Sequence, residues 1–204
     1  MNKTSAMPNL PNNPISVMDA IYQRRSVRDF TPEKVSEADI HMLMYAAIQA
    51  PTAMHEEPWA FAVVQDRKLL DRLSETAKQT IWLQAQSEDG SGLARRAVNM
   101  VSDPAYHVFY NAGALIVIYG KPMGPFTVAD CWLAAENLML SACTAGLGTC
   151  VIGLAVPALN SPEWKKQLDI PAEMTAYAPI LLGYPAEALV PSPARKPPEL
   201  ICWK

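Results

Sequence analysis

Three arginines and a serine lie close together near the start of the chain, at Arg24, Arg25, Ser26 and Arg28. Guanidinium groups form paired hydrogen bonds with phosphate or carboxylate oxygens, and a hydroxyl adds one more donor. The cluster follows a segment with helical spacing, and cations also stabilise the carbonyl end of a helix without any ligand. The pattern therefore indicates either an anion site or a solvated basic face.

A second candidate is the loop between a predicted helix and a predicted strand, which Pro51 and Pro58 stiffen. Ligand sites often occupy such connections, and this loop carries the small or polar residues Thr52, Ala53 and His55. His55 has no neighbouring cysteine or serine nucleophile, so it gives little sign of acid–base catalysis. The loop is either a binding segment or an ordinary connection with an exposed histidine.

Glycines mark a third candidate, the segment 145–153 with the sequence A-G-L-G-T-C-V-I-G. They either admit a planar ligand close to the backbone or mark a helix end and a strand start. The segment lacks G-x-G-x-x-G and follows a helix rather than a strand, which disfavours a Rossmann domain. A fourth candidate, 191–198, is rich in proline and carries Arg195 and Lys196. It is either an extended arm or a polyproline ligand.

Hydrophobic periodicity and turn residues predict the elements that position these candidates. Ser16, Ser36 and Thr127 each precede an aspartate by three residues, which is typical of a helix start. Predicted helices lie near 16–24, 36–47, 69–77, 127–143 and 161–168, and predicted strands near 59–64, 114–119, 150–154 and 175–182. The alternation favours a mixed α/β sheet flanked by helices.

The same pass predicts the domain organisation. Residues 1–14 are expected to be a flexible tail, 15–204 a single domain, 82–104 an irregular surface excursion or lid, and 186–204 a C-terminal arm. Gly146 is expected to end the helix 127–143. Apolar residues surround that helix, which predicts that it is buried on all sides.

Composition excludes several classes of protein. The chain has 204 residues and a formal net charge of −3, which is too acidic for a dedicated nucleic-acid binder. No apolar run is long enough to span a bilayer, and the first residues contain no secretory signal, so we expect a cytoplasmic protein without membrane contact. The four cysteines and three histidines show no metal-ligand spacing, so no metal site is predicted.

The order of the motifs along the chain resembles the nitroreductase family of flavin enzymes. R-R-S-V-R is followed by Asp29-Phe30, then A-P-T-A-x-x-x-x-P-W-x-F, and then A-E-N-L-x-L-x-A-x-x-x-G-L-G-T-C. L-G-Y-P-A-E at 182–187 and R-K-P at 195–197 complete the set. The resemblance covers roughly 15–203 and is least clear over 82–104.

The resemblance implies an α+β fold of three layers, α/β/α, with a central, mostly antiparallel sheet flanked by helices. It also implies a homodimer that binds FMN non-covalently at its interface. Members take hydride from NADH or NADPH and reduce nitroaromatics, quinones or similar acceptors by a ping-pong mechanism. Because the flavin performs this chemistry, no catalytic protein residue is implied.

Matching the motifs position by position implies a set of cofactor-binding residues. The first arginines and the serine match the grip on the phosphate and ribityl chain, and Arg28 matches the cation beside the flavin N1–O2 edge. Loop 51–53 matches the segment that lies along the ring from the partner subunit, and 152–154 match the backbone near N5 and O4. Arg195, with Lys196, matches a C-terminal phosphate clamp. The set is Arg24, Arg25, Ser26, Arg28, Pro51, Thr52, Ala53, His55, Ile152, Gly153, Leu154 and Arg195.

The chain departs from the family pattern at three positions. His55 and Glu57 stand where members usually carry Asn and Gln, and Pro193 replaces a common cation. An ionised Glu57 only accepts hydrogen bonds, so it cannot replace an amide donor. Two alternatives stay open: a flavin-dependent reductive dehalogenase or flavin-fragmenting enzyme of the same fold, with 82–104 as lid, or a flavin-binding interaction protein without turnover.

Overall fold

The computed structural model describes residues 15–87, 92–188 and 195–204. Its helices are α1 (Val17–Gln23), α2 (Glu37–Ala47), α3 (Arg67–Ser87), α4 (Gly92–Val101), α5 (Thr127–Thr144), α6 (Val156–Leu159) and α7 (Pro162–Gln167). The strands are β1 (Trp59–Val64), β2 (Ala114–Gly120), β3 (Gly148–Val151) and β4 (Thr175–Gly183). Of two short 3-10 turns, η1 (Ala53–His55) lies within the candidate loop and η2 (Gly153–Ala155) follows β3.

The four strands form one antiparallel sheet in the order β1-β2-β4-β3. All of β2 is buried, which explains its continuous apolar sequence. Trp59 lies opposite Gly120 and Val64 opposite Leu115, which fixes the register of the first strand pair. The predicted antiparallel sheet is therefore confirmed.

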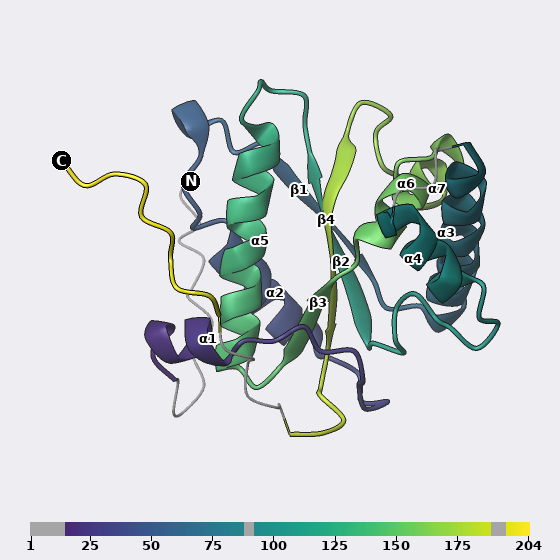
Figure 1. Cartoon of the computed structure of the whole chain (residues 1–204), viewed down its shortest axis with the longest axis horizontal. Helices are drawn as coiled ribbons and strands as arrows, with labels where there is room; N and C mark the ends of the chain where they lie inside the picture. The colour runs from purple at the N-terminus through teal and green to yellow at the C-terminus, as the bar shows by residue number, and fades with distance from the viewer. Residues whose placement is uncertain (1–14, 88–91, 189–194) are drawn as a thin grey trace, which may run out of the picture.

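Helices cover both faces of the sheet, as Figure 1 shows: α1, α2 and α5 lie on one side, and α3, α4, α6 and α7 on the other. Alternate residues of β2 divide between two cores. Leu115, Val117 and Tyr119 belong to the core beneath α3, whereas Ile116 and Ile118 pack with residues of α2 and α5. The predicted three-layer α+β arrangement is confirmed.

Serine caps begin α1 and α2, as the sequence predicts, and Ser161 also caps α7. Ser16 accepts a hydrogen bond from the Asp19 N–H at 3.0 Å, and Ser36 accepts one from the Asp39 N–H at 3.1 Å. Gly146 follows α5 with φ +73°, a backbone conformation that favours glycine. Helix α5 begins at Thr127, as predicted, but Thr127 does not cap it: Phe126 stands at the N-cap, no side chain caps the helix, and Asp130 binds another segment.

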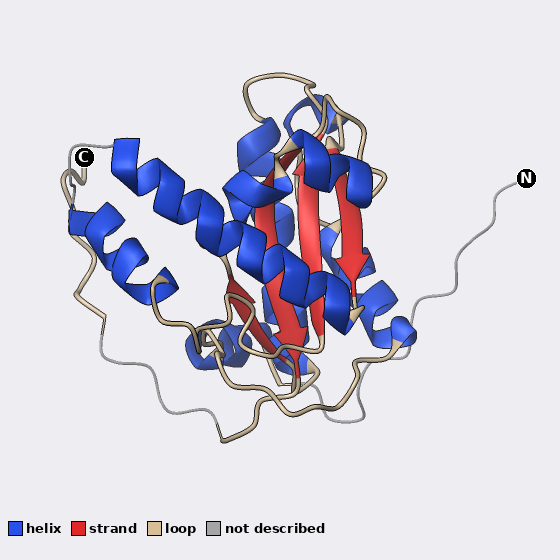
Figure 2. Ribbon diagram, turned by 90° about the vertical axis from the view of Figure 1, so that its right-hand side faces the viewer, coloured by secondary structure: helices blue, strands red, loops and turns tan. Residues whose placement is uncertain are grey.

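The prediction of an irregular excursion over 82–104 is wrong. Helix α3 continues through Ser87, and α4 occupies Gly92–Val101, so most of the stretch is helical. The two helices contact each other, and α3 crosses one face of the sheet (Figure 2). The polar centre of the stretch, 88–91, lies outside the described residues.

Two further expectations need correction. Strand β3 covers Gly148–Val151 rather than 150–154, because Gly153 begins a 3-10 turn. Helix α5 is not buried on all sides: Val128, Trp132 and Leu133 are 44%, 40% and 46% exposed. One side of α5 therefore presents apolar residues to the exterior of the single chain. Helix α6 was not predicted from the sequence.

No described helix is both long and apolar enough to span a membrane.

Candidate cofactor site

Strand β3 positions the arginine-rich segment. After α1 ends at Gln23, Ser26 forms a parallel bridge with Thr149, and the Val27 N–H donates to the Thr149 carbonyl at 2.9 Å. A Cβ on Gly148 would lie 2.7 Å from Val27 Cγ2, so only glycine allows this close approach. The segment 24–28 thus lies along the edge of the sheet.

The arginines have donors that other groups leave unsatisfied. Arg25 Nε is buried and has no hydrogen-bond partner among the described residues, although another nitrogen of this guanidinium donates to the Arg24 carbonyl. Arg24 Nε lies 3.6 Å from Glu136 Oε1, a long contact with a half-exposed carboxylate. A buried guanidinium N–H without an acceptor is costly, and an anion would satisfy it. The structure therefore fits the predicted phosphate grip.

The thiols beside the arginines lie in the same electrostatic environment. Burial raises the pKa of Cys150. The charges of Arg28 and Arg24 and a hydrogen bond with Ser26 oppose this shift. Burial also raises the pKa of Cys143, against the opposing influence of Arg24 and Arg25. These thiols stay protonated at neutral pH, so neither is an activated nucleophile.

A pair of tyrosines lies near the arginine segment, with Tyr106 close enough to Arg28 to feel its charge. The Tyr106 and Tyr110 hydroxyls are 3.1 Å apart, and their rings pack edge to face. Burial and the Tyr110 hydrogen bond raise the pKa of Tyr106, and nearby Arg28 opposes this shift. Sequence reasoning missed these tyrosines, because nothing in the spacing of the loop after α4 connects them with Arg28.

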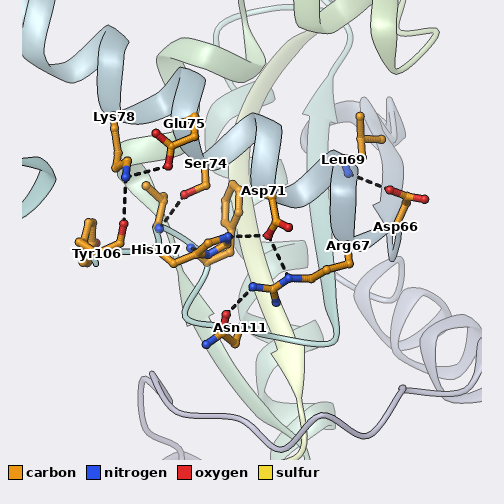
Figure 3. A network of polar contacts seen from close by, with 12 residues as sticks. Asp66, Arg67, Leu69, Asp71, Ser74, Glu75, Lys78, Tyr106, His107 and Asn111 are labelled. Carbon is orange, nitrogen blue, oxygen red and sulfur yellow. Dashed lines mark hydrogen bonds and ion pairs between the residues drawn. The ribbon is translucent and has the colours of Figure 1, made fainter. Parts of the chain in front are cut away.

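A polar network attaches the tyrosine loop to α3 (Figure 3). Asp71 Oδ1 binds Arg67 Nε at 2.9 Å and His107 Nε2 at 3.0 Å, while Ser74 Oγ accepts from the Val108 N–H at 3.0 Å. Since His107 Nδ1 accepts from the Phe109 N–H, the ring proton lies on Nε2. Burial lowers the pKa of His107.

The loop 51–53 is held from α5. The Ala53 N–H donates to both carboxylate oxygens of Asp130, at 3.3 and 3.4 Å, and Asp130 is only 4% exposed. His55 is exposed with φ 58° and forms no hydrogen bond or ion pair with the described residues. Sequence reasoning used Asp130 only as a helix-start signal. Asp130 is the only charged residue in the first turn of a largely apolar helix, and this feature could have identified it as a residue that binds a neighbouring segment.

The remaining predicted residues are distributed as follows. The Ile152 N–H donates to the Pro179 carbonyl at 2.9 Å, and Gly153 has open space where a Cβ would lie. Leu154 is half-buried. Arg195 is exposed and forms no hydrogen bond or ion pair with the described residues.

Helix α5 separates two parts of the predicted site. Loop 51–53 lies at its N-terminal end, whereas the arginine segment lies near Glu136 and Cys143, toward its other end (Figure 1). From Asp130 to Cys143 the helix rises about 20 Å.

Two cavities, of 590 Å³ around Arg67 and of 460 Å³ around Trp82, are lined by residues outside the predicted cofactor-binding set. The described residues contain no cluster suited to a metal ion.

Residues 21–184 match the model of the nitroreductase family. A protein of Archaeoglobus fulgidus, provisionally named NADH dehydrogenase/NAD(P)H nitroreductase, is 30% identical over 82% of this chain and 84% of its own length. The chain belongs to the nitroreductase family. Membership supports a general oxidoreductase function and confirms the resemblance on which the predicted site rests.

Other members of the nitroreductase family agree in fold. A nitroreductase of Bacteroides fragilis, solved with bound FMN, has a TM-score of 0.79 and 25% identity, covering 93% of this chain and all of that one. An iodotyrosine deiodinase of Thermotoga neapolitana is 25% identical over 82% of this chain and 87% of its own length. The relatives of this chain thus include one named as a nitroreductase and one named as a deiodinase.

Proposed function

We propose that this chain is an FMN-dependent oxidoreductase that takes hydride from NAD(P)H and passes it to nitroaromatics, quinones or similar acceptors by a ping-pong mechanism. The observation that carries the proposal is Arg25 Nε, which is buried beside Ser26 and Arg24 and has no partner within the described part of the chain. A family relative solved with FMN supports the identity of the anion that this nitrogen would bind.

The arginine segment would bind and orient the cofactor. Arg24, Arg25 and Ser26 offer donors to a phosphate that carries nearly two negative charges, and guanidinium groups suit it because they bind in pairs. Arg28, which is exposed beside Cys150 and Tyr106, would stabilise negative charge at the ring edge. When bound, FMN supplies the hydride chemistry.

Two backbone segments would contact the ring. Residues 152–154 follow edge strand β3, where Gly153 leaves open space above the backbone. Loop 51–53 would cover the ring of the partner's cofactor, with His55 at its rim. Arg195 would reach the phosphate from the arm that ends the chain, although the single chain leaves it exposed.

A homodimer would complete the site. The loop and the arginine segment lie toward opposite ends of α5, so two chains related by symmetry would supply one of each to each flavin. Unpartnered apolar side chains on α1 and α5 support this arrangement. They are Val17, Met18, Ile21, Tyr22, Phe126, Val128, Trp132 and Leu133.

Reductive dehalogenation is a second candidate function. The related Thermotoga neapolitana protein is named iodotyrosine deiodinase, and the groove of 460 Å³ between α3 and α4 is lined by Lys78, Trp82 and Leu83. A groove between two helices that contains a tryptophan is suited to covering an aromatic substrate. This candidate uses the same cofactor site and differs in the acceptor.

Anaerobic mixing of the FMN-loaded protein with NADH or NADPH tests the proposal. We expect the yellow flavin absorption to bleach and then to return when a nitroaromatic or quinone is added. Return only with a halogenated tyrosine would favour the second candidate. FMN that stays oxidised with both nicotinamides would contradict the proposal and favour a binding protein without turnover.

A further inference from the structure

The turn η1 follows Thr52 and is not capped by that residue. Thr52 stands at the N-cap position with φ −129° and ψ 150°, yet its side chain accepts no hydrogen bond from the turn. Threonine at this position usually accepts from a backbone N–H two or three residues on. The half-buried Thr52 hydroxyl has no hydrogen-bond partner among the described residues, so it is available to a ligand.

Asp130 supplies the acceptor that secures the start of this turn. Its two carboxylate oxygens lie 3.3 and 3.4 Å from the Ala53 nitrogen, although 77 positions separate the two residues in the chain. A carboxylate that is 4% exposed is costly unless donors and positive potential surround it. The first turn of α5 provides such potential, which keeps the anion tolerable in this place.

The loop depends on this contact more than on its own conformational preference. Met54, His55 and Glu57 have φ values of 56°, 58° and 46°, a region that disfavours residues other than glycine. Over the described parts of the chain, the bond to Asp130 is the only side-chain hydrogen bond onto 51–57. A strained and exposed loop keeps one shape only when its surroundings fix it.

We propose that Asp130 is a positioning residue. It fixes the plane of the Thr52–Ala53 peptide and thereby aims the Thr52 hydroxyl at the flavin ring. The inference rests on the proposed function, because that function makes loop 51–53 a cover for the ring. It adds that Asp130 acts through Thr52, which is the group that would touch the cofactor.

The first experiment needs no flavin and measures hydrogen exchange of the Ala53 amide by NMR. Asp130→Ala should speed the exchange at least tenfold, whereas Asp130→Asn should stay near the parent because its amide oxygen still accepts. Thr52→Val should leave the exchange unchanged, since Thr52 does not bind this N–H. Unchanged exchange in Asp130→Ala, or faster exchange in Thr52→Val, would overturn the inference.

The second experiment titrates apoprotein with FMN and with riboflavin, following the quenching of flavin fluorescence. Loss of one ring hydrogen bond should weaken binding of both by about tenfold in Thr52→Val and in Asp130→Ala. Thr52→Ser and Asp130→Asn should bind within about twofold of the parent. Adding Thr52→Val to Asp130→Ala should cost nothing more, because an unaimed hydroxyl has no bond left to lose.

Asn137→Ala is the matched control, since Asn137 also lies on α5 and donates to a backbone carbonyl of α2, at 3.3 Å from Ala46 O. It should lower thermal stability without changing flavin affinity.

Parental affinity in Asp130→Ala, or a further tenfold loss in the double variant, would overturn the inference. If Asp130→Ala does not fold, parental flavin affinity in Thr52→Val would overturn it, while loss with rescue by Thr52→Ser would support it. A parent that binds no flavin would contradict the proposed function, and the Ala53 exchange would still decide the role of Asp130.

Discussion

At the scale of single residues, Arg25 carries most of the functional argument. Its Nε is buried beside the edge of the sheet and has no acceptor among the residues that the structure describes, which is rare for a guanidinium that serves only the fold. The sequence predicts an arginine cluster, but it does not distinguish a solvated basic face from an anion site. That distinction depends on the close approach of segment 24–28 to β3, where Arg25 Nε is buried.

Arg25→Ala should weaken FMN binding by about 2–5 kcal/mol, because truncation leaves the charge of the phosphate without a desolvated partner. Riboflavin lacks the phosphate and should bind this variant as it binds the parent. Arg96→Ala, which removes an exposed cation of α4, is the control and should change neither affinity. Fluorescence titration of the apoproteins gives both values. An equal loss for FMN and riboflavin in Arg25→Ala would show that Arg25 does not bind the phosphate.

His107 should make stability depend on pH. Burial holds its pKa below the ordinary value of about 6.5, so the unfolded chain takes up the proton at a higher pH than the folded one. The stability is fully present above about pH 6.5 and falls as the pH drops toward the lower folded pKa. Melting temperatures measured from pH 7.5 to 5 should fall less in His107→Gln than in the parent. The exposed His41→Gln is the control and should follow the parent.

Some residue roles could not be read from the sequence. Asp130 and Ala53 are far apart in the chain, and only the packing of α5 against the loop brings them together. Tyr106 approaches Arg28, and α3 holds the loop that carries Tyr106 through Asp71 and Ser74. These are long-range contacts, which local spacing does not encode.

At the scale of the elements, local patterns predicted β1, β2 and β4 well, because short apolar runs between turn residues have few alternatives. The prediction of an irregular segment over 82–104 failed because its centre is polar and contains two glycines, a composition typical of a loop. The prediction that α5 is buried on all sides failed for another reason. Its exposed Trp132 and Leu133 are apolar, and a single sequence does not say whether the fold or another chain covers them.

Gly148→Ala tests how β3 positions the arginine segment. The new Cβ would lie 2.7 Å from Val27 Cγ2, so the segment must move or strain, at about 1–3 kcal/mol of stability. FMN affinity should fall with it, because Arg25 and Ser26 move together with Val27. Adding Val27→Ala should recover only part of both losses, because the Cβ of residue 27 would still lie 2.8 Å from the new Cβ. Gly153→Ala has nothing within 4 Å of its new Cβ and serves as the stability control in thermal melts. An unchanged melting temperature in Gly148→Ala would refute this view of β3.

At the scale of the whole molecule, the fold places the two halves of the proposed site near opposite ends of α5 and leaves apolar surface on α1 and α5. We expect light scattering at low micromolar concentration to find only the dimer. Leu133→Glu should weaken assembly and FMN retention together, because a charge would be buried between subunits. Leu83→Glu, at a 62% exposed position of α3, should leave the dimer intact. A stable monomer that retains a full complement of FMN would contradict the shared site.

The most direct test of a flavin site is the visible absorption spectrum of the purified protein, recorded before and after incubation with FMN and gel filtration. The arrangement of Arg24, Arg25 and Ser26 predicts flavin peaks that stay with the protein at about one FMN per chain. The peaks should be retained with FMN and largely lost with riboflavin, since the phosphate provides much of the grip. A protein that passes through the column colourless after incubation with FMN would contradict the central claim.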